Sequence, residues 1–390
     1  MNKPARSRRT AHPVARTAQP VKPRERVVAA LNCRTPDRVP VVEYLFSPKL
    51  QQALLGYTTP LYDGPSQLAL AHKLGLDGMW IPINGFCGLE EEVHPMGASY
   101  QDEWGVTYVK NGWPIMVQTD SPIKSRADWS RYTMPRASAP HRPAMLSAAV
   151  QNNPHDLAII AGFLGPFTMM YWYLMDLATL SVTIHDDPAL VREMTAAFTA
   201  WTLESAQLAA DLGGVDAFSI SDDWGGTTSL LMSPRHLREF FIPPFRDIVQ
   251  GMKRLGLPVI MHNDGRIWDV LDDLVDTGIN AFHPVELAAG MDLARVKERY
   301  RGRLCPIGNI NNKTTMVTGT PEDVRREALE CLRIAAPGGG YILATDHSLH
   351  DDIPLENIRA YVGVVKENGT YPFICSHEQP PQTKAQRAAK

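Results

Sequence analysis

Short apolar runs alternate with amphipathic, helix-like segments along most of the chain. Each run is six or seven residues long and continuously apolar in character, as in strands buried within a parallel sheet. Several of the intervening segments begin with Asp, Ser or Thr beside Pro and end at Gly, the usual start and stop signals of helices. The predicted strands occupy residues 38–44, 78–83, 157–162, 217–223, 258–264, 281–286, 304–310 and 341–347.

Eight such strand–helix units favour an α/β fold of the (β/α)8 TIM-barrel type over an open doubly wound sheet. Residues 23–38 predict an N-terminal helix and turn that pack on the bottom or side of the barrel. Residues 91–120 alternate polar and aromatic positions, which predicts an inserted β-hairpin or meander that covers one end. We expect one barrel domain over residues 24–372, between flexible tails at residues 1–23 and 373–390.

The composition is that of a globular enzyme-sized protein, with 44% hydrophobic and 21% charged residues. No apolar stretch approaches the roughly 18 residues that a membrane span needs, and no signal-peptide core is present. The scattered cysteines fit reduced thiols. We therefore expect a cytoplasmic protein without membrane contact.

Basic residues are concentrated at the start of the chain. Residues 1–26 hold eight Lys or Arg against one acid, while the whole chain has a formal net charge of −3. Removing this segment leaves a net charge of −10 for the remainder, which argues against nucleic-acid binding by the barrel. The segment also has the composition of a transit peptide, a less favoured interpretation.

Ionisable side chains accumulate where the predicted strands end. Barrel active sites are built at the carboxyl ends of strands and in the loops after them. The residues in such positions are Glu43, Asp222, Asp223, His262, Asp264, His283, Glu286, Asn309, Asp346 and His347. We predict catalytic or substrate contacts by Glu43 and by one of the two adjacent aspartates, since neighbours on a strand face opposite ways. The other aspartate, of Asp222 and Asp223, would cap the next helix.

The strongest chemical signal is the pair His262 and Asp264. Residues two apart on a strand project to the same face, here the barrel mouth. With His347 they would form a two-histidine, one-carboxylate metal site with open coordination positions. The alternative is that both histidines only donate hydrogen bonds to loop carbonyls.

Substrate contacts are predicted from the remaining residues of the rim. The aromatic, Met-rich stretch 165–176 supplies pocket candidates, although such a stripe is more often plain core. The predicted substrate-binding residues are Trp224, Phe167, Tyr171, His283, Glu286 and Asn309.

Five stretches together resemble the uroporphyrinogen decarboxylase superfamily. They are "TPDRVPVVEY", "GPFTMMYWYL", "DDWGGTTSLLMSPRHLREFFIPPF", the segment from His262 to Ile310, and "PGGGYILATDHSLHDDIPLENIRAYV". The resemblance extends from about residue 24 to residue 370 and implies a (β/α)8 barrel. True uroporphyrinogen decarboxylases carry an Arg-rich motif of the type RQAGR that holds porphyrinogen carboxylates, whereas residues 41–52 here read "VVEYLFSPKLQQ". Decarboxylation of a many-carboxylate tetrapyrrole is therefore disfavoured.

The resemblance is stronger to the corrinoid-linked methyltransferase branch of the superfamily. That branch holds zinc with a His-x-Cys pair and a later Cys, and the matching positions here are His262, Asp264 and His347. Oxygen and nitrogen donors replace both thiolates, so zinc is expected and iron becomes possible.

The resulting hypothesis is a metal-dependent methyltransferase or demethylase. It would move a methyl group between a small methylated substrate and a corrinoid (cobalamin) cofactor, supplied by a corrinoid-binding partner protein; a homodimer is also expected. The alternatives are a decarboxylase, lyase or hydrolase that works without corrinoid on a small carboxylated substrate, and a non-catalytic binding barrel.

Overall fold

Eight parallel strands form the centre of the molecule in a computed structural model that describes residues 21–60, 63–83, 95–110 and 117–373. Hydrogen-bonded neighbours follow the order β10-β9-β8-β7-β6-β2-β1-β11. The strands are β1 (Val42–Phe46), β2 (Gly78–Pro82), β6 (Ala158–Leu164), β7 (Ala217–Ser221), β8 (Val259–His262), β9 (Ala281–His283), β10 (Cys305–Pro306) and β11 (Ser348–His350). Seven of the eight predicted strands thus overlap a regular strand.

The eighth predicted strand, residues 341–347, is the exception. It forms isolated parallel bridges, from Ile342 to Ile307 on one side and from Leu343 to Val41 on the other. Regular pairing begins later, in β11, which continues along β1. These bridges join the last strand to the first, so the sheet curls into the predicted TIM-like barrel.

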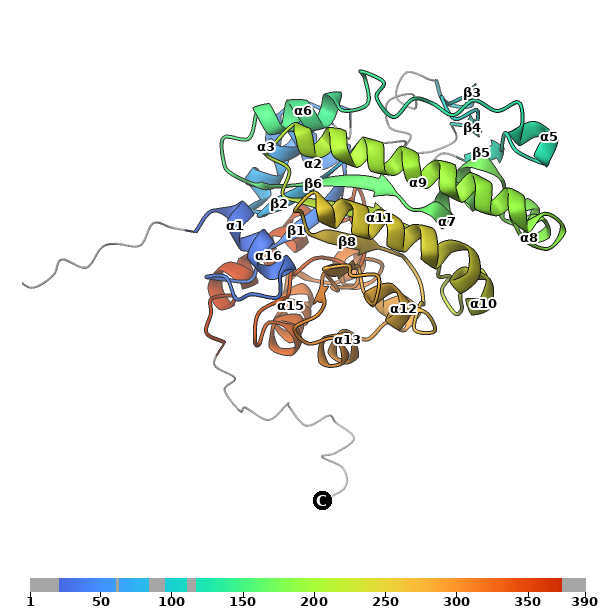
Figure 1. The fold of residues 1–390 in the computed structure, drawn as a ribbon. Coiled ribbons are helices and arrows are strands. Elements are labelled where there is room, and N and C mark those ends of the chain that lie inside the picture. The colour runs from blue at the N-terminus through green and yellow to red at the C-terminus, as the bar shows by residue number, and fades with distance from the viewer. Residues whose placement is uncertain (1–20, 61–62, 84–94, 111–116, 374–390) are drawn as a thin grey trace, which may run out of the picture.

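Helices surround the sheet, as Figure 1 shows. They are α1 (Pro23–Leu31), α2 (Pro48–Leu55), α3 (Gly64–Leu74), α5 (Arg126–Trp129), α6 (Ala144–Gln151), α7 (Pro166–Thr168), α8 (Leu177–Asp186), α9 (Pro188–Asp211), α10 (Pro234–His236), α11 (Ile242–Arg254), α12 (Leu271–Val275), α13 (Leu293–Arg299), α14 (Thr315–Thr318), α15 (Pro321–Ala335) and α16 (Leu355–Asn368). Three further helical segments are not α-helices. They are the π-helices η1 (Met169–Leu174) and η2 (Leu237–Phe241) and the 3-10 helix η3 (Leu287–Ala289). The caps follow the sequence signals: Asp187 accepts from the amide of Leu190 at the start of α9, where Pro188 holds the first helical position.

The inside of the barrel is a separate apolar cluster from the layer between sheet and helices. Alternate residues of the strands, such as Val42, Ile160 and Ile260, fill it. Val27, Ala30 and Leu31 of α1 join the same cluster. The predicted N-terminal helix therefore closes the bottom of the barrel, and the opposite, carboxyl end of the strands stays available for a site.

The insertion forms a three-stranded antiparallel sheet. Its strands are β3 (Ser99–Gln101), β4 (Thr107–Val109) and β5 (Val117–Asp120). Trp104, between β3 and β4, packs edge-on against Trp201 of α9 at 4.9 Å between ring centroids. The described part of the predicted meander thus lies beside α9 (Figure 1), on the outside of the barrel.

The predicted tails fall mostly outside the described residues, at 1–20 and 374–390. Among the helices that are described, none combines the length and the hydropathy needed to cross a bilayer.

Candidate active site at the carboxyl end of the barrel

Strand register gathers the polar residues at the mouth. His262, the last residue of β8, pairs in register with Ser221 of β7 and with His283 of β9. Side chains at paired positions of parallel strands share one face. Because Ile260, two residues before His262, lies in the interior cluster, His262 also faces the inside. Residues two apart along an extended chain share one face, so Asp264 lies on the same side as His262. Oδ2 of Asp264 is 3.8 Å from Nε2 of His262.

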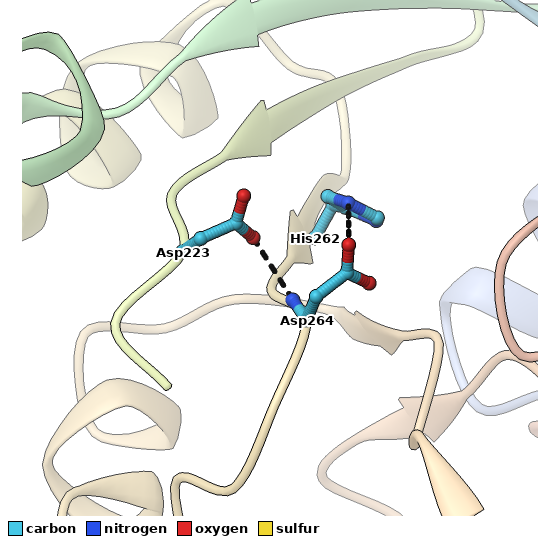
Figure 2. Close-up of side chains that lie close together, drawn as sticks. All are labelled: Asp223, His262 and Asp264. Atoms are coloured by element: carbon cyan, nitrogen blue, oxygen red, sulfur yellow. Dashed lines mark hydrogen bonds and ion pairs between the residues drawn. The ribbon is translucent and has the colours of Figure 1, made fainter. Parts of the chain in front are cut away.

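Asp223, His262 and Asp264 form the one group of possible metal ligands found in the described part of the chain. One donor atom from each lies within 4.8 Å of the other two. Figure 2 shows the three side chains converging from the ends of neighbouring strands, with the backbone N–H of Asp264 donating to Oδ1 of Asp223 at 2.9 Å. The predicted His–Asp pair is thus joined by Asp223, which the sequence had suggested for catalysis.

His347, the third predicted ligand, reaches the group through Asp264 alone. Its Nε2 lies 3.2 Å from Oδ2 of Asp264, while its Nδ1 contacts the hydroxyl of Ser348 at 2.9 Å. The side chain of His347 is 48% exposed, against 13% for His262 and 32% for Asp264. The group of donor atoms within 4.8 Å of one another thus contains Asp223 and not His347, whose role as a metal ligand stays a prediction.

The two carboxylates have opposite electrostatic surroundings. Burial alone would raise the pKa of Asp264, but His262 and His347 more than offset this and hold that pKa well below its usual range. Burial and the adjacent charge of Asp264 raise the pKa of Asp223 well above its usual range. When both are ionised, two carboxylates this close repel each other, and a cation between them relieves that repulsion.

Burial disfavours the protonated, charged form of the two inner histidines, His262 and His283. Burial lowers the pKa of His262 and, more strongly, that of His283. For His347, burial acts to lower the pKa, but the ion pair with Asp264 raises it by more. The pKa of His347 therefore lies above the usual value. Neutral imidazole is the form that binds metal ions.

Sequence reasoning missed Tyr44. Its ring stacks on Trp80 at 4.3 Å and lies edge-on to His262 at 5.5 Å between centroids. Burial raises the pKa of its phenol, with the charges of Asp264 and Asp223 adding to the effect. Val42 and Tyr44 are two apart on β1, so they share a face, and Val42 fills the barrel interior. The alternation along β1 therefore indicates that Tyr44 also faces inward.

Glu43, between these two residues, therefore faces the other way, which corrects its predicted catalytic role. It is fully buried and accepts hydrogen bonds from the amide of Thr345 at 2.7 Å and from the hydroxyl of Tyr361 on α16 at 2.9 Å. Burial raises its pKa to about 8. Glu43 thus ties β1 to the closing segment and to α16, away from the mouth.

Asp222 follows the same alternation and also faces outward. Its Oδ1 accepts from the amide of Thr168 at 2.7 Å, and the carboxyl lies against Gly165. Burial raises the pKa of Asp222 to about 7. Asp222 thus accepts hydrogen bonds from the first turn of the helix after β6, whereas the prediction had one of the paired aspartates capping the next helix along the chain.

The predicted aromatic pocket residues separate into core and rim. Phe167 and Trp224 are fully buried and pack with Phe241 and Phe245, so they belong to the core. Tyr171 remains partly exposed, and the charge of Asp223 contributes to its raised pKa after burial. Tyr171 is therefore the aromatic residue of the three that stays at the mouth.

The remaining predicted contacts lie at different depths. Glu286 is at the rim, where it accepts from the amide of Gly265 at 2.7 Å and pairs with Lys313 at 3.1 Å. Asp346 is buried nearby, and burial raises its pKa to about 6. Asn309 lies deeper, donating to the carbonyl of Val285 at 3.0 Å and contacting Cys331, so it holds loops together rather than facing a substrate.

The group Asp223, His262 and Asp264 suits a divalent metal ion. It offers two carboxylates and one neutral imidazole, donors that zinc and iron(II) accept. Oδ1 of Asp264 is buried and has no hydrogen-bond partner among the described residues. Because buried polar atoms usually have a partner, this oxygen is a candidate ligand for a cation.

A family model for uroporphyrinogen decarboxylase (URO-D) matches residues 104–368, more than half of the chain. The chain belongs to the URO-D family. Among the relatives, a uroporphyrinogen decarboxylase of Psychromonas ingrahamii is 31% identical over 168 residues, which cover 42% of this chain and 44% of that protein. One from Chlorobium luteolum is 25% identical over 265 residues, covering 64% and 72% of the two chains. The chain thus spans less than half of the first relative and about seven-tenths of the second.

Solved structures support the same fold. A methyltransferase from Methanosarcina mazei superposes with a TM-score of 0.67 at 21% identity, covering 89% of this chain and 98% of that one. A putative vitamin-B12-independent methionine synthase from Listeria monocytogenes gives a TM-score of 0.52 at 14% identity, covering 85% and 98%. At these identities the likeness concerns the fold, which is the barrel of the URO-D family.

Proposed function

We propose that this URO-D family member is a metal-dependent methyltransferase that moves a methyl group between a small methylated substrate and a corrinoid carried by a partner protein. The observation that carries the proposal is the convergence of Asp223, His262 and Asp264 at the barrel mouth. The likeness to the Methanosarcina mazei methyltransferase supports the choice of reaction class.

The three ligands would hold a divalent ion, with zinc favoured and iron(II) the main alternative. When bound, such an ion supplies Lewis acidity that makes the heteroatom next to a methyl group a better leaving group. The carboxylates of Asp223 and Asp264, forced together at the mouth, favour a divalent cation because it neutralises both charges.

Other residues would shape the substrate side of the site. The rings of Tyr44 and Tyr171 provide apolar and aromatic surface beside the metal group. His347, with its raised pKa and its Nε2 at 3.2 Å from Asp264, can hold a proton beside the carboxylate. Lys313 and Glu286 form an ion pair at the rim, where a substrate would enter.

A decarboxylase or lyase without corrinoid is the second candidate, favoured by the names of the curated relatives. Against it stands the stretch 41–52, whose one cation, Lys49, contacts the backbone of Asp351. Without an arginine clamp this stretch offers no bidentate partner for substrate carboxylates.

The test is a pair of assays on the same preparation, with metal content measured by elemental mass spectrometry. Methyl transfer from methylated ethers, amines and thiols to reduced cob(I)alamin would be followed by the absorption change of the corrinoid, and carbon dioxide release would be measured without corrinoid. About one metal per chain and metal-dependent methylation of the corrinoid are expected. Carbon dioxide release with no methyl transfer would replace the proposal by the second candidate.

A further inference from the structure

His283 is the closest polar neighbour of the ligand His262. The two residues are in register on β8 and β9, and their Nδ1 atoms lie 2.7 Å apart. The rings are nearly parallel, at 28° and 5.0 Å between centroids. His283 is fully buried, its ring packed beside Trp80 and Tyr44.

A contact of 2.7 Å between two imidazole nitrogens holds one proton. If His283 donates it, the remaining proton of neutral His262 sits on Nε2, which points toward Asp264 and cannot then bind a metal. If His262 donates it, Nε2 of His262 presents a free lone pair to the group of Asp223 and Asp264. The tautomer of His283 thus decides whether His262 is a ligand.

The other nitrogen of His283 leaves this choice open. Its Nε2 is buried without a hydrogen-bond partner among the described residues, so no second protein group fixes where the proton of His283 resides. Both tautomers of the pair have the same number of protons. A cation placed between Asp223 and Asp264 selects the one in which Nε2 of His262 is bare.

We propose that His283 is a positioning residue for metal binding: by accepting a hydrogen bond from Nδ1–H of His262 it holds that histidine in the tautomer that can ligate. This inference rests on the proposed function, because it concerns the same metal group. Ligand histidines commonly donate their second N–H to a carboxylate or carbonyl. Here a neutral imidazole takes that place, which holds the ring without adding a third negative charge to the two carboxylates.

The matched variants are His283→Asn and His283→Leu. The two replacements have nearly the same shape, but the carbonyl oxygen of Asn can still accept a hydrogen bond near the position of Nδ1, and Leu cannot. Zinc affinity of metal-stripped full-length protein would be measured by calorimetry, with thermal melting of the metal-free forms as the check of folding. Glu43→Gln, on the outer side of the barrel, serves as the control that leaves zinc affinity unchanged.

We expect His283→Leu to bind zinc about 10- to 100-fold more weakly, the usual effect of losing an outer partner of a metal ligand, and His283→Asn to recover most of the affinity. Nitrogen-15 spectra of the zinc-loaded wild type should show His262 protonated at Nδ1 and His283 at Nε2. Equal zinc affinity in folded His283→Leu and wild type would overturn the role of His283 alone. Failure of the wild type to bind either zinc or iron(II) would overturn the proposed function, and this inference with it.

Discussion

The barrel places carboxylic acids in two different surroundings, one within β1 and one just beyond the ends of β7 and β8. Glu43 of β1 is fully buried and Asp223 and Asp264 are partly exposed, and burial acts to raise the pKa of each. Glu43 is surrounded by neutral donors from Thr345 and Tyr361 that satisfy its oxygens. The aspartates instead face two histidines and each other, and one oxygen of Asp264 has no partner in the described structure.

This difference distinguishes an acid that holds the fold from acids that are set up for chemistry. Glu43, whose oxygens all have hydrogen-bond partners and whose pKa favours the protonated form, links β1 to α16 by hydrogen bonds. Two carboxylates held together beside neutral imidazole retain electrostatic strain that a cation relieves. Buried acids are therefore informative through their partners rather than through their pKa alone.

The largest expected effect is at the metal group. His262→Ala or Asp264→Ala should lose stoichiometric metal and lower the turnover by at least about 100-fold, more than the loss of an outer partner, because each removes a ligand itself. Elemental mass spectrometry and the corrinoid assay would measure both. Unchanged metal content and turnover in either variant would show that the pair Asp223 and Asp264 is no more set up for chemistry than Glu43 is.

A large loss of stability is expected at Gly165. A Cβ there would lie 2.1 Å from Cγ of Asp222, so Gly165→Ala should reduce the free energy of unfolding by about 3 kcal/mol, through overpacking against a buried carboxyl. Gly226→Ala is the control, since its Cβ would meet no atom closer than 3.4 Å. Urea denaturation of both variants would decide; similar midpoints would show that Asp222 moves freely and is no fixed cap.

Glu43 should make stability depend on pH. Its pKa of about 8 in the folded chain lies above the ordinary 4.5, so the folded state keeps a proton that the unfolded state releases. Its contribution is thus complete below pH 4.5 and is lost as the pH rises to about 8, on the order of 2 kcal/mol after allowance for relaxation.

Glu43→Gln should remove that part of the pH dependence while it keeps the fold, because an amide resembles the protonated acid. The hydroxyl of Thr345 lies 2.9 Å from the carbonyl oxygen of His347, so it can donate there and accept from position 43. Chemical denaturation between pH 5 and pH 9 gives the comparison with wild type. An unchanged slope in the variant would show that Glu43 is ionised in the native state.

The smallest effect is expected at His347. It contacts the metal group only through Asp264, so His347→Gln should weaken zinc binding by less than about 10-fold, the low end for an outer partner. Calorimetric titration of the metal-free variant measures this. A loss as large as that of His262→Ala would restore His347 to the set of direct ligands.

Strand periodicity explains what the sequence could and could not predict. The apolar runs predicted the barrel, and the spacing of His262 and Asp264 predicted their shared face, since both depend on local geometry. The same rule applied to β1 would have chosen Tyr44 over Glu43. Two sets of alternate residues in β1 could face the interior. Only the closed sheet, with Val42 inside the barrel, shows which set does.

Contacts between one strand and the next could not be predicted from the pattern within a single segment. The pairing of His262 with His283 depends on the register of β8 against β9, and the inclusion of Asp223 depends on the end of β7. Likewise, the segment 341–347 reads as a strand but closes the barrel through single bridges. Each of these is set by tertiary packing rather than by the pattern of the segment itself.

The central claim is that Asp223, His262 and Asp264 bind one metal ion. The most direct measurement is anomalous diffraction at the zinc edge from crystals of the full chain grown with zinc. One strong anomalous peak is expected within bonding distance, about 2.0–2.2 Å, of a nitrogen of His262 and of carboxylate oxygens of Asp223 and Asp264. A barrel mouth without a peak, or a peak bound by other residues while these three remain apart, would contradict it.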